Sequence, residues 1–205
     1  GLSKRAKNPT ISPDLQDKPS AQMALAVIEL ASLARGAVVV DAIAKRSPVK
    51  LEAAQAVSPG KFLILISGGV AEVDESLKSA LETSEGVLVD HLFLPQAHPS
   101  ITDALAGIRQ DCEIDSMGTF ETYTASAALG ALDTALKMTE VTLVGVHLCL
   151  GIGGKGYWLI TGPLHSVQES IEAAIQVTKR DKLVTSEVVG APHPEAVETM
   201  LSLFQ

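Results

Sequence analysis

The chain has 205 residues, of which 46% are hydrophobic and only 3% aromatic, and its formal net charge is −8. This length fits one large domain or two domains of about 100 residues each. The acidic balance excludes a general nucleic-acid-binding protein, because phosphate binding needs a basic surface. No apolar run reaches the roughly 18 to 20 residues of a membrane-spanning helix, so we expect neither nucleic acid nor a membrane as a partner.

The first twenty residues contain three prolines and many polar side chains. This composition predicts a flexible tail over residues 1–20, and it lacks the apolar centre of a secretory signal. Cys112 and Cys149 form neither a CxxC pair nor a disulfide framework. Their spacing suits a reducing cytosol.

Apolar periodicity predicts six elements in the part of the chain that follows. They are, in order, a strand over 23–30, a helix over 32–47, strands over 50–57 and 61–67, a helix over 70–84 and a strand over 87–95. The first helix ends at a Ser-Pro stop, and the second carries an apolar stripe at helical spacing. The order β-α-β-β-α-β is that of a ferredoxin-like α+β domain.

The same pattern occurs a second time in the chain. Three polar residues recur 92 positions later: Glu29 as Glu121, Asp41 as Asp133, and Lys45 as Lys137. Lys61 recurs 94 positions later as Lys155, and the segment QAHP at 96–99 recurs 95 positions later as APHP. We therefore expect two tandem domains, over residues 21–110 and 115–205.

The segment GIGGKG at 151–156 matches the spacing G-x-G-x-x-G of dinucleotide-binding loops. That site needs a helix after the loop, whereas a strand, YWLIT, follows here. A Walker A loop fails too, because Gly156 follows Lys155 where Ser or Thr binds magnesium. The counterpart loop in the first copy is only SPGK. We therefore expect the glycines to serve sharp turns and the close approach of loops around an axis.

These motifs resemble the bacterial microcompartment (BMC) shell domain. The resemblance rests on ELASLARG, VSPGKFLILISGG, LGIGGKGYW and an HP element in both copies, and it covers residues 21–205. Two such domains in one chain resemble the tandem shell proteins that form trimers, including the iron–sulfur-binding type of propanediol-utilisation compartments. The resemblance implies a homotrimeric pseudohexamer with one central pore, without catalytic activity, located in a microcompartment shell in the cytoplasm.

The resemblance also implies roles for particular residues. By this resemblance, the pore is lined by Val57, Ser58, Pro59 and Gly60 in alternation with Gly151, Ile152, Gly153 and Gly154. By the same resemblance, the contacts at the tile edges are made by Lys45, Lys137, His98 and His193. Such tiles join other BMC shell proteins, both hexamers and pentamers, edge to edge, and encapsulated enzymes are further partners.

The sequence departs from the family pattern in two places, at the first loop and at the edge motif. In the iron–sulfur type, a cysteine precedes the PGK of the first loop; here that residue is Ser58, and an alcohol is a poor cluster ligand. The edge motif PRPH of many shell proteins is replaced by PQAH and GAPH, which lack its arginine. We therefore expect no metal site and no cofactor. Because the edge lysine of the family is present twice, as Lys45 and Lys137, we still expect the tiles to join edge to edge.

Other readings of the polar residues remain. No two of the five histidines have a metal-binding spacing, and His98 and His193, each before a proline, suit structural capping. Glu29 and Glu121 suit polar contacts between domains, and Cys149 suits a buried position within a strand. Lys61 and Lys155 either raise the potential near a pore or stay solvated. The alternatives to a shell tile are a small-molecule-binding regulatory module of ferredoxin-like repeats and an enzyme with a nucleotide site at GIGGKG.

Overall fold

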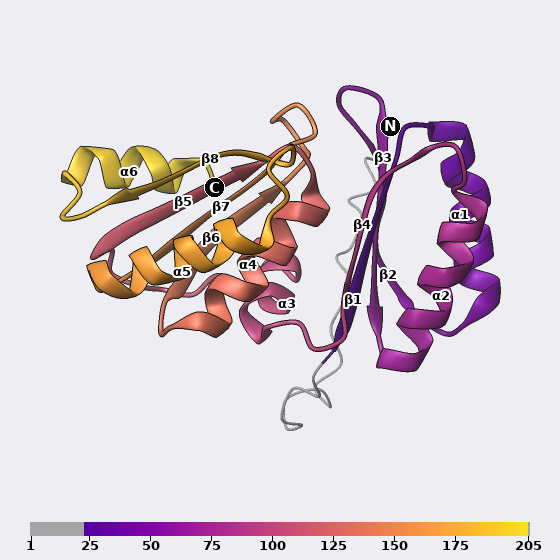
Figure 1. Cartoon of the computed structure of the whole chain (residues 1–205), viewed down its shortest axis with the longest axis horizontal. Coiled ribbons are helices and arrows are strands. Elements are labelled where there is room, and N and C mark those ends of the chain that lie inside the picture. The colour runs from indigo at the N-terminus through magenta and orange to yellow at the C-terminus, as the bar shows by residue number, and fades with distance from the viewer. Residues whose placement is uncertain (1–22, 205) are drawn as a thin grey trace, which may run out of the picture.

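The structure is a computed structural model that describes residues 23–204, and it contains two four-stranded sheets, each with two helices on one face (Figure 1). The first half consists of β1 (Ala24–Leu30), α1 (Leu33–Arg46), β2 (Lys50–Val57), β3 (Lys61–Gly68), α2 (Val70–Thr83) and β4 (Leu88–Leu94). The second half consists of β5 (Ser116–Thr122), α4 (Ala125–Met138), β6 (Thr142–Leu148), β7 (Gly156–Gly162), α5 (Leu164–Val177) and β8 (Leu183–Val189). The predicted β-α-β-β-α-β order is confirmed in both halves, while the tail expected at 1–20 lies outside the described residues.

Both sheets are antiparallel and have equivalent strand orders, β2-β3-β1-β4 and β6-β7-β5-β8. In the first sheet, α1 and α2 cover one face and bury Ile28 and Ile64 against Val39, Ile43 and Val73. The strand β1 is buried along its whole length because its other face is covered as well. Its unbroken apolar run is the pattern expected of a strand enclosed on two sides.

The second domain supplies that cover. Helix α4 lies against β1 and β4 of the first sheet (Figure 1), and its Leu129 and Leu132 share one core with Leu25 and Val27. The N-cap Thr124 begins this helix by accepting a hydrogen bond from the amide of Ala127. The two domains are therefore joined by a continuous apolar contact rather than by a linker alone.

Each domain has a short helix after its fourth strand, which the sequence analysis did not predict. They are α3 (Pro99–Leu105) and α6 (Pro194–Ser202). Each begins with the His-Pro pair: Nδ1 of His98 accepts from the amide of Ser100 at 3.2 Å, and Nδ1 of His193 from Glu195 at 3.3 Å. The expected capping role of both histidines is thus confirmed, with proline in the first turn where its missing N–H costs nothing.

Candidate functional site

The contact between the domains is organised around Glu29, whose side chain is fully buried at the end of β1. Its carboxylate accepts hydrogen bonds from the amides of Ala125 and Ser126, both at 3.0 Å, and from the Ser126 hydroxyl at 2.6 Å. Ala125 and Ser126 are the first two residues of α4, and backbone N–H groups in the first turn of a helix have no acceptor within the helix. The negative charge also faces the positive end of the helix dipole. A carboxylate of the first domain thus holds the start of a helix of the second, which confirms the interpretation of Glu29.

Lys61 completes this contact. Its ammonium group lies 3.1 Å from Glu29 Oε1 and donates to the Gly154 carbonyl at 2.9 Å, and its side chain is only 14% exposed. In the second domain, Lys155 pairs with Glu121 at 2.9 Å, and this hydrogen bond raises the pKa of Lys155. Each lysine therefore has a carboxylate partner beside it, but only Lys61 is largely withdrawn from solvent, since the Lys155 side chain remains 37% exposed.

The two loops singled out from sequence meet at this junction. Gly151, Gly153 and Gly154 have φ values of 72°, 67° and 77°, a backbone region that favours glycine. A Cβ atom at Gly154 would lie 2.5 Å from the Ser58 carbonyl oxygen, so the approach of the two loops also requires glycine there. A strand, β7, follows the loop. The glycine-rich segment therefore serves turning and close approach, as expected.

The predicted pore residues do not all reach the surface of these loops. Ser58, Pro59 and Gly60 are exposed at the turn between β2 and β3, as are Gly151 and Gly153 in the other loop. Val57, in contrast, is 4% exposed and belongs to the core. Val57 is the last residue of β2, and it packs in the core that the two domains share.

Cys149 is buried, as predicted, but it does not lie in a strand. Strand β6 ends at Leu148, and Cys149 turns the chain with a φ of 66°. Its Sγ lies 3.4 Å from the Gly154 carbonyl, and burial, together with the nearby Glu29 carboxylate, raises the pKa of the thiol to about 11. Within residues 23–204, no group of three or more His, Cys, Asp or Glu side chains is placed to hold a metal ion.

A second set of polar contacts joins α4 to the end of β4. Asp133 accepts from the His98 amide at 2.8 Å and pairs with Lys137 at 2.6 Å, and Lys137 donates to the Gln96 carbonyl at 2.5 Å. Lys137 and His98 therefore lie where the two domains of one chain meet. The assignment of Lys45, Lys137, His98 and His193 to tile edges stays a prediction.

The comparisons with known proteins agree with this duplicated architecture. The family model described as "BMC domain" matches residues 24–97 and 116–192. The chain belongs to the BMC domain family. It is 33% identical over 171 residues to the bacterial microcompartment shell protein PduT of Citrobacter freundii, which covers 83% of this chain and 93% of that protein.

Solved structures of BMC proteins show the same arrangement. A microcompartment protein from Desulfitobacterium hafniense DCB superposes with a TM-score of 0.78 at 32% identity, covering 87% of this chain and 99% of its own. The fused permuted hexameric shell protein MSM0275 of the RMM microcompartment superposes with a TM-score of 0.58 at 20% identity, over 78% and 85% of the two chains. The second likeness supports the fold alone.

The two BMC domains differ in how their first helices are covered. Helix α4 buries nine residues, whereas α1, its counterpart, buries only Gly36, Val39 and Ile43. Leu33 at the start of α1 is 48% exposed, while Ala125, the equivalent residue of α4, is 0% exposed. The uncovered side of α1 therefore presents the positions that α4 uses against the neighbouring domain.

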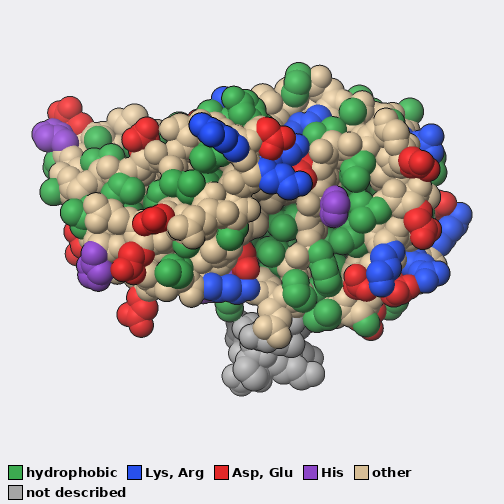
Figure 2. Space-filling model, in the orientation of Figure 1, with side chains coloured by type: hydrophobic (Ala, Val, Ile, Leu, Met, Phe, Trp, Pro, Cys, Tyr) green, Lys and Arg blue, Asp and Glu red, His purple; other side chains and the backbone are tan. Residues whose placement is uncertain are grey.

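On the face seen in Figure 2, acidic, basic and hydrophobic side chains are interspersed, and no large patch of a single charge is present there. In the part of the chain that the structure describes, no helix has both the length and the apolar character needed to cross a bilayer.

Proposed function

We propose that three copies of this shell protein form a pseudohexameric tile in which six BMC domains surround one central pore. Its role as a structural component of a bacterial microcompartment shell, and not as an enzyme, follows from the two BMC domains and from the relation to PduT. One observation supports the trimer. The residues that join the two domains within one chain have equivalents in the other copy of the domain, and within residues 23–204 no second domain covers these equivalents, which leaves their contacts unused.

The first unused contact involves Glu121. It occupies the position in β5 that Glu29 occupies in β1, and it is paired with Lys155 as Glu29 is with Lys61. Glu29 is fully buried beneath the N-terminus of α4, whereas the Glu121 side chain remains 30% exposed. In the trimer, the amides at the start of α1 of the next copy, Leu33 and Ala34, bind Glu121.

The second unused contact involves the C-terminal half of α1. Asp41 and Lys45 form an ion pair at 2.6 Å whose side chains are 61% and 74% exposed. Their equivalents, Asp133 and Lys137, bind the chain segment before α3. In the trimer, Asp41 and Lys45 bind the equivalent segment before α6 of a neighbouring copy, residues 191–193.

Helix α6 provides a third contact of the same kind. Its counterpart α3 packs against β6 of the following domain, and Ile101 of α3 is fully buried. In contrast, α6 has no buried residue, and β2, the equivalent of β6, has an exposed edge. A neighbouring copy brings these two surfaces together.

The pore lies where the loops of six domains converge. Ser58, Pro59 and Gly60 alternate around it with Gly151, Ile152 and Gly153, while Val57 and Gly154 support them from behind. The Ser58 hydroxyl and exposed glycine amides suit the passage of small polar metabolites. Because Ser58 offers an alcohol in place of a thiolate, we expect no iron–sulfur cluster there.

The outer edges of the tile join it to other shell proteins, hexamers and pentamers among them. Lys45, Lys137, His98 and His193 lie beside the domain contacts already described, and the side chains of Lys45 and Lys137, which remain 74% and 46% exposed there, reach the neighbouring tile from that position. Its inward face meets the encapsulated enzymes. Lysine at an edge suits this role because its flexible ammonium group reaches backbone carbonyls of a neighbour.

The trimer is tested by the solution mass of the purified chain, measured by light scattering at several salt concentrations. The parent chain has the mass of three copies. Glu121→Arg places a cation beside Lys155 and at the positive end of the incoming α1, so it yields monomers. Glu172→Arg, on the exposed side of α5, is the matched control and remains trimeric. A monomeric parent chain, or a trimeric Glu121→Arg, contradicts the proposal.

The pore is tested by the flux of a small polar solute into assembled shells. Replacing Ser58 by leucine puts three apolar side chains at the opening, one from each copy, and slows the flux. Ala71→Leu, at the exposed start of α2, is the control and leaves it unchanged. Equal flux through all three shells would exclude Ser58 from the pore.

A further inference from the structure

A cavity of about 240 Å³ lies between α3, the segment after it, β6 and the C-terminal end of the described chain. Its residues carry both charged and apolar groups. The polar ones are Ser100, Asp103, Arg109, Gln110 and His147, and the main apolar side chains are Val144, Val146 and Phe204. All of them belong to one chain, so the cavity forms without a second copy.

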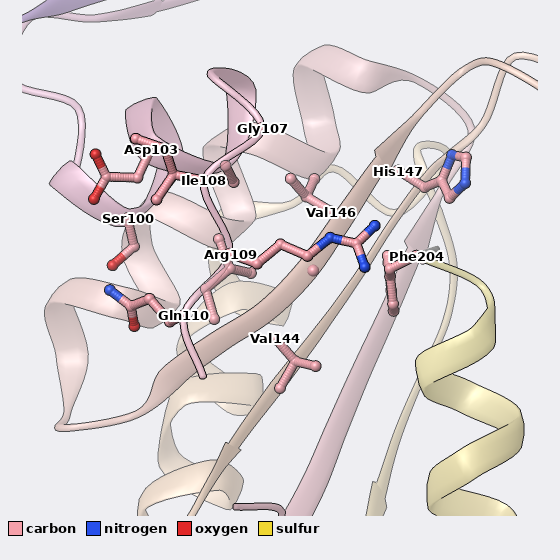
Figure 3. A pocket seen from close by; sticks show the side chains of 13 residues that line it. Ser100, Asp103, Gly107, Ile108, Arg109, Gln110, Val144, Val146, His147 and Phe204 are labelled. Carbon is pink, nitrogen blue, oxygen red and sulfur yellow. The ribbon is translucent and has the colours of Figure 1, made fainter. Parts of the chain in front are cut away.

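The charges of this cavity are separated. Figure 3 shows the Arg109 side chain extending across the pocket toward Phe204 and His147, while Asp103 lies at the opposite end. No ion pair within residues 23–204 involves Arg109. The guanidinium group is therefore available for a ligand, with apolar surface directly beside it.

Phe204 closes one wall of the cavity. Its ring stacks on Tyr157 with centroids 5.6 Å apart and lies 6.1 Å from the ring of His147. A Cβ atom at position 145 would lie 2.5 Å from the Phe204 ring, so Gly145 makes the room that the ring occupies. The aromatic wall is thus held in place by its own sheet.

The internal repeat shows that the fold does not require these polar residues. The residues equivalent to Arg109, His147, Asp103 and Ser100 are Phe204, Gln55, Glu198 and Glu195. The contacts made by Glu29, Asp133 and Lys137, in contrast, involve residue types that both copies keep. The cation is therefore specific to this cavity, because the residue equivalent to Arg109 is the uncharged Phe204, while the equivalents of Ser100 and Asp103 are both acidic.

We propose that this cavity binds a small monocarboxylate. Arg109 pairs with the carboxylate, for which its planar guanidinium offers two parallel donors. Val144, Val146 and Phe204 contact the hydrocarbon part of the ligand. The volume lies below the roughly 300 Å³ at which pockets for drug-sized ligands begin, which selects a short chain. Asp103 at the far end disfavours a second negative charge on the ligand.

The proposal is tested by titrating the full-length chain with butyrate at constant ionic strength, followed by calorimetry and by NMR shifts of the backbone amides around β6. Butyrate binds saturably, whereas its neutral analogue butyramide and the dicarboxylate succinate bind at least about threefold more weakly. Because Arg109 is exposed, Arg109→Gln weakens butyrate binding by about threefold to fivefold, the range expected for losing one exposed charge pair.

Arg180→Gln, in the exposed connection between α5 and β8, is the matched control and binds butyrate as the parent chain does. Equal thermal unfolding of both variants shows that each is folded. The proposal is overturned if butyrate does not saturate the chain, if Arg109→Gln binds as tightly as the parent, or if butyramide competes equally. None of these outcomes depends on the mass of the assembly, so the result is separate from that of the trimer test.

Discussion

Helices α1 and α4 occupy the same place in two copies of one domain, yet their surroundings are opposite. The side of α4 that faces the first domain is buried in the core, with Gly130 close to Leu92 of β4. The equivalent residue of α1, Val38, is 50% exposed. The difference does not come from the local fold, since both helices run for 14 residues and both begin at a hydroxyl N-cap. It comes from what lies next to each helix: α4 has a neighbouring domain in its own chain, and α1 needs one from another copy.

The same comparison applies to single side chains. Residues at equivalent positions of the two copies have the same side chain but differ in burial and in the number of hydrogen-bond partners. This holds for Glu29 and Glu121 and for Asp133 and Asp41. Buried carboxylates with several donors are costly to remove, because the remaining partners lose their compensation. Exposed pairs contribute little. Replacing matched residues in the two copies therefore measures how much of each contact comes from the neighbouring domain.

The largest effect is expected for Glu29→Ala. The replacement leaves the Lys61 ammonium without its buried partner and removes three acceptor contacts at the start of α4. We expect the free energy of unfolding to fall by about 3 to 5 kcal/mol, measured by urea unfolding. Glu121→Ala, measured at a dilution where the chain is monomeric, lowers it by less than about 1 kcal/mol. Equal losses in the two variants would show that the interdomain contact is not what distinguishes these residues.

A smaller effect is expected for Asp133→Ala, which leaves the His98 amide without its acceptor and leaves Lys137 with only the Gln96 carbonyl. The free energy of unfolding falls by about 1 to 3 kcal/mol, the cost of an unsatisfied partly buried group. Asp41→Ala removes only an exposed pair between successive helical turns, and the diluted chain loses less than about 0.5 kcal/mol. Asp41→Ala also weakens the trimer, so it raises the concentration at which half of the chains are assembled, which sedimentation at a series of concentrations detects.

The smallest effect concerns pH. Burial lowers the pKa of His98 below its ordinary value of 6.5, and its Nδ1 must be unprotonated to accept from Ser100. As pH falls below 6.5 the unfolded chain takes up this proton first, so the stability present above pH 6.5 decreases as pH falls through the lower folded pKa. His98→Asn keeps an N-cap acceptor and flattens the melting temperature between pH 7.5 and 5. His193→Asn, at the exposed cap, is the control; a profile flattened by that variant alone would contradict the assignment.

Much of the architecture was predictable because it depends on local patterns. The apolar periodicity of 61–67 and of 70–84 identifies a strand and a helix, and the recurrence of Glu29 as Glu121 reveals the duplication. The helices α3 and α6 were missed because seven and nine residues with few apolar positions give a weak periodic signal. Cys149 was placed in a strand because its neighbours are leucines, and only the backbone shows that the chain turns there.

The sequence by itself determined that this protein has two equivalent domains, that its glycine-rich loops serve turning rather than phosphate binding, and which family it resembles. These conclusions rest on residue type and on the spacing between residues, both of which the sequence contains directly. Only the tertiary structure decided that Glu29 is enclosed while Glu121 is not, that Lys61 is paired, that Val57 points inward, and that Arg109 faces an open cavity. Each of these depends on which distant segment lies against the residue, and burial sets the energy of a charge far more strongly than its place in the sequence.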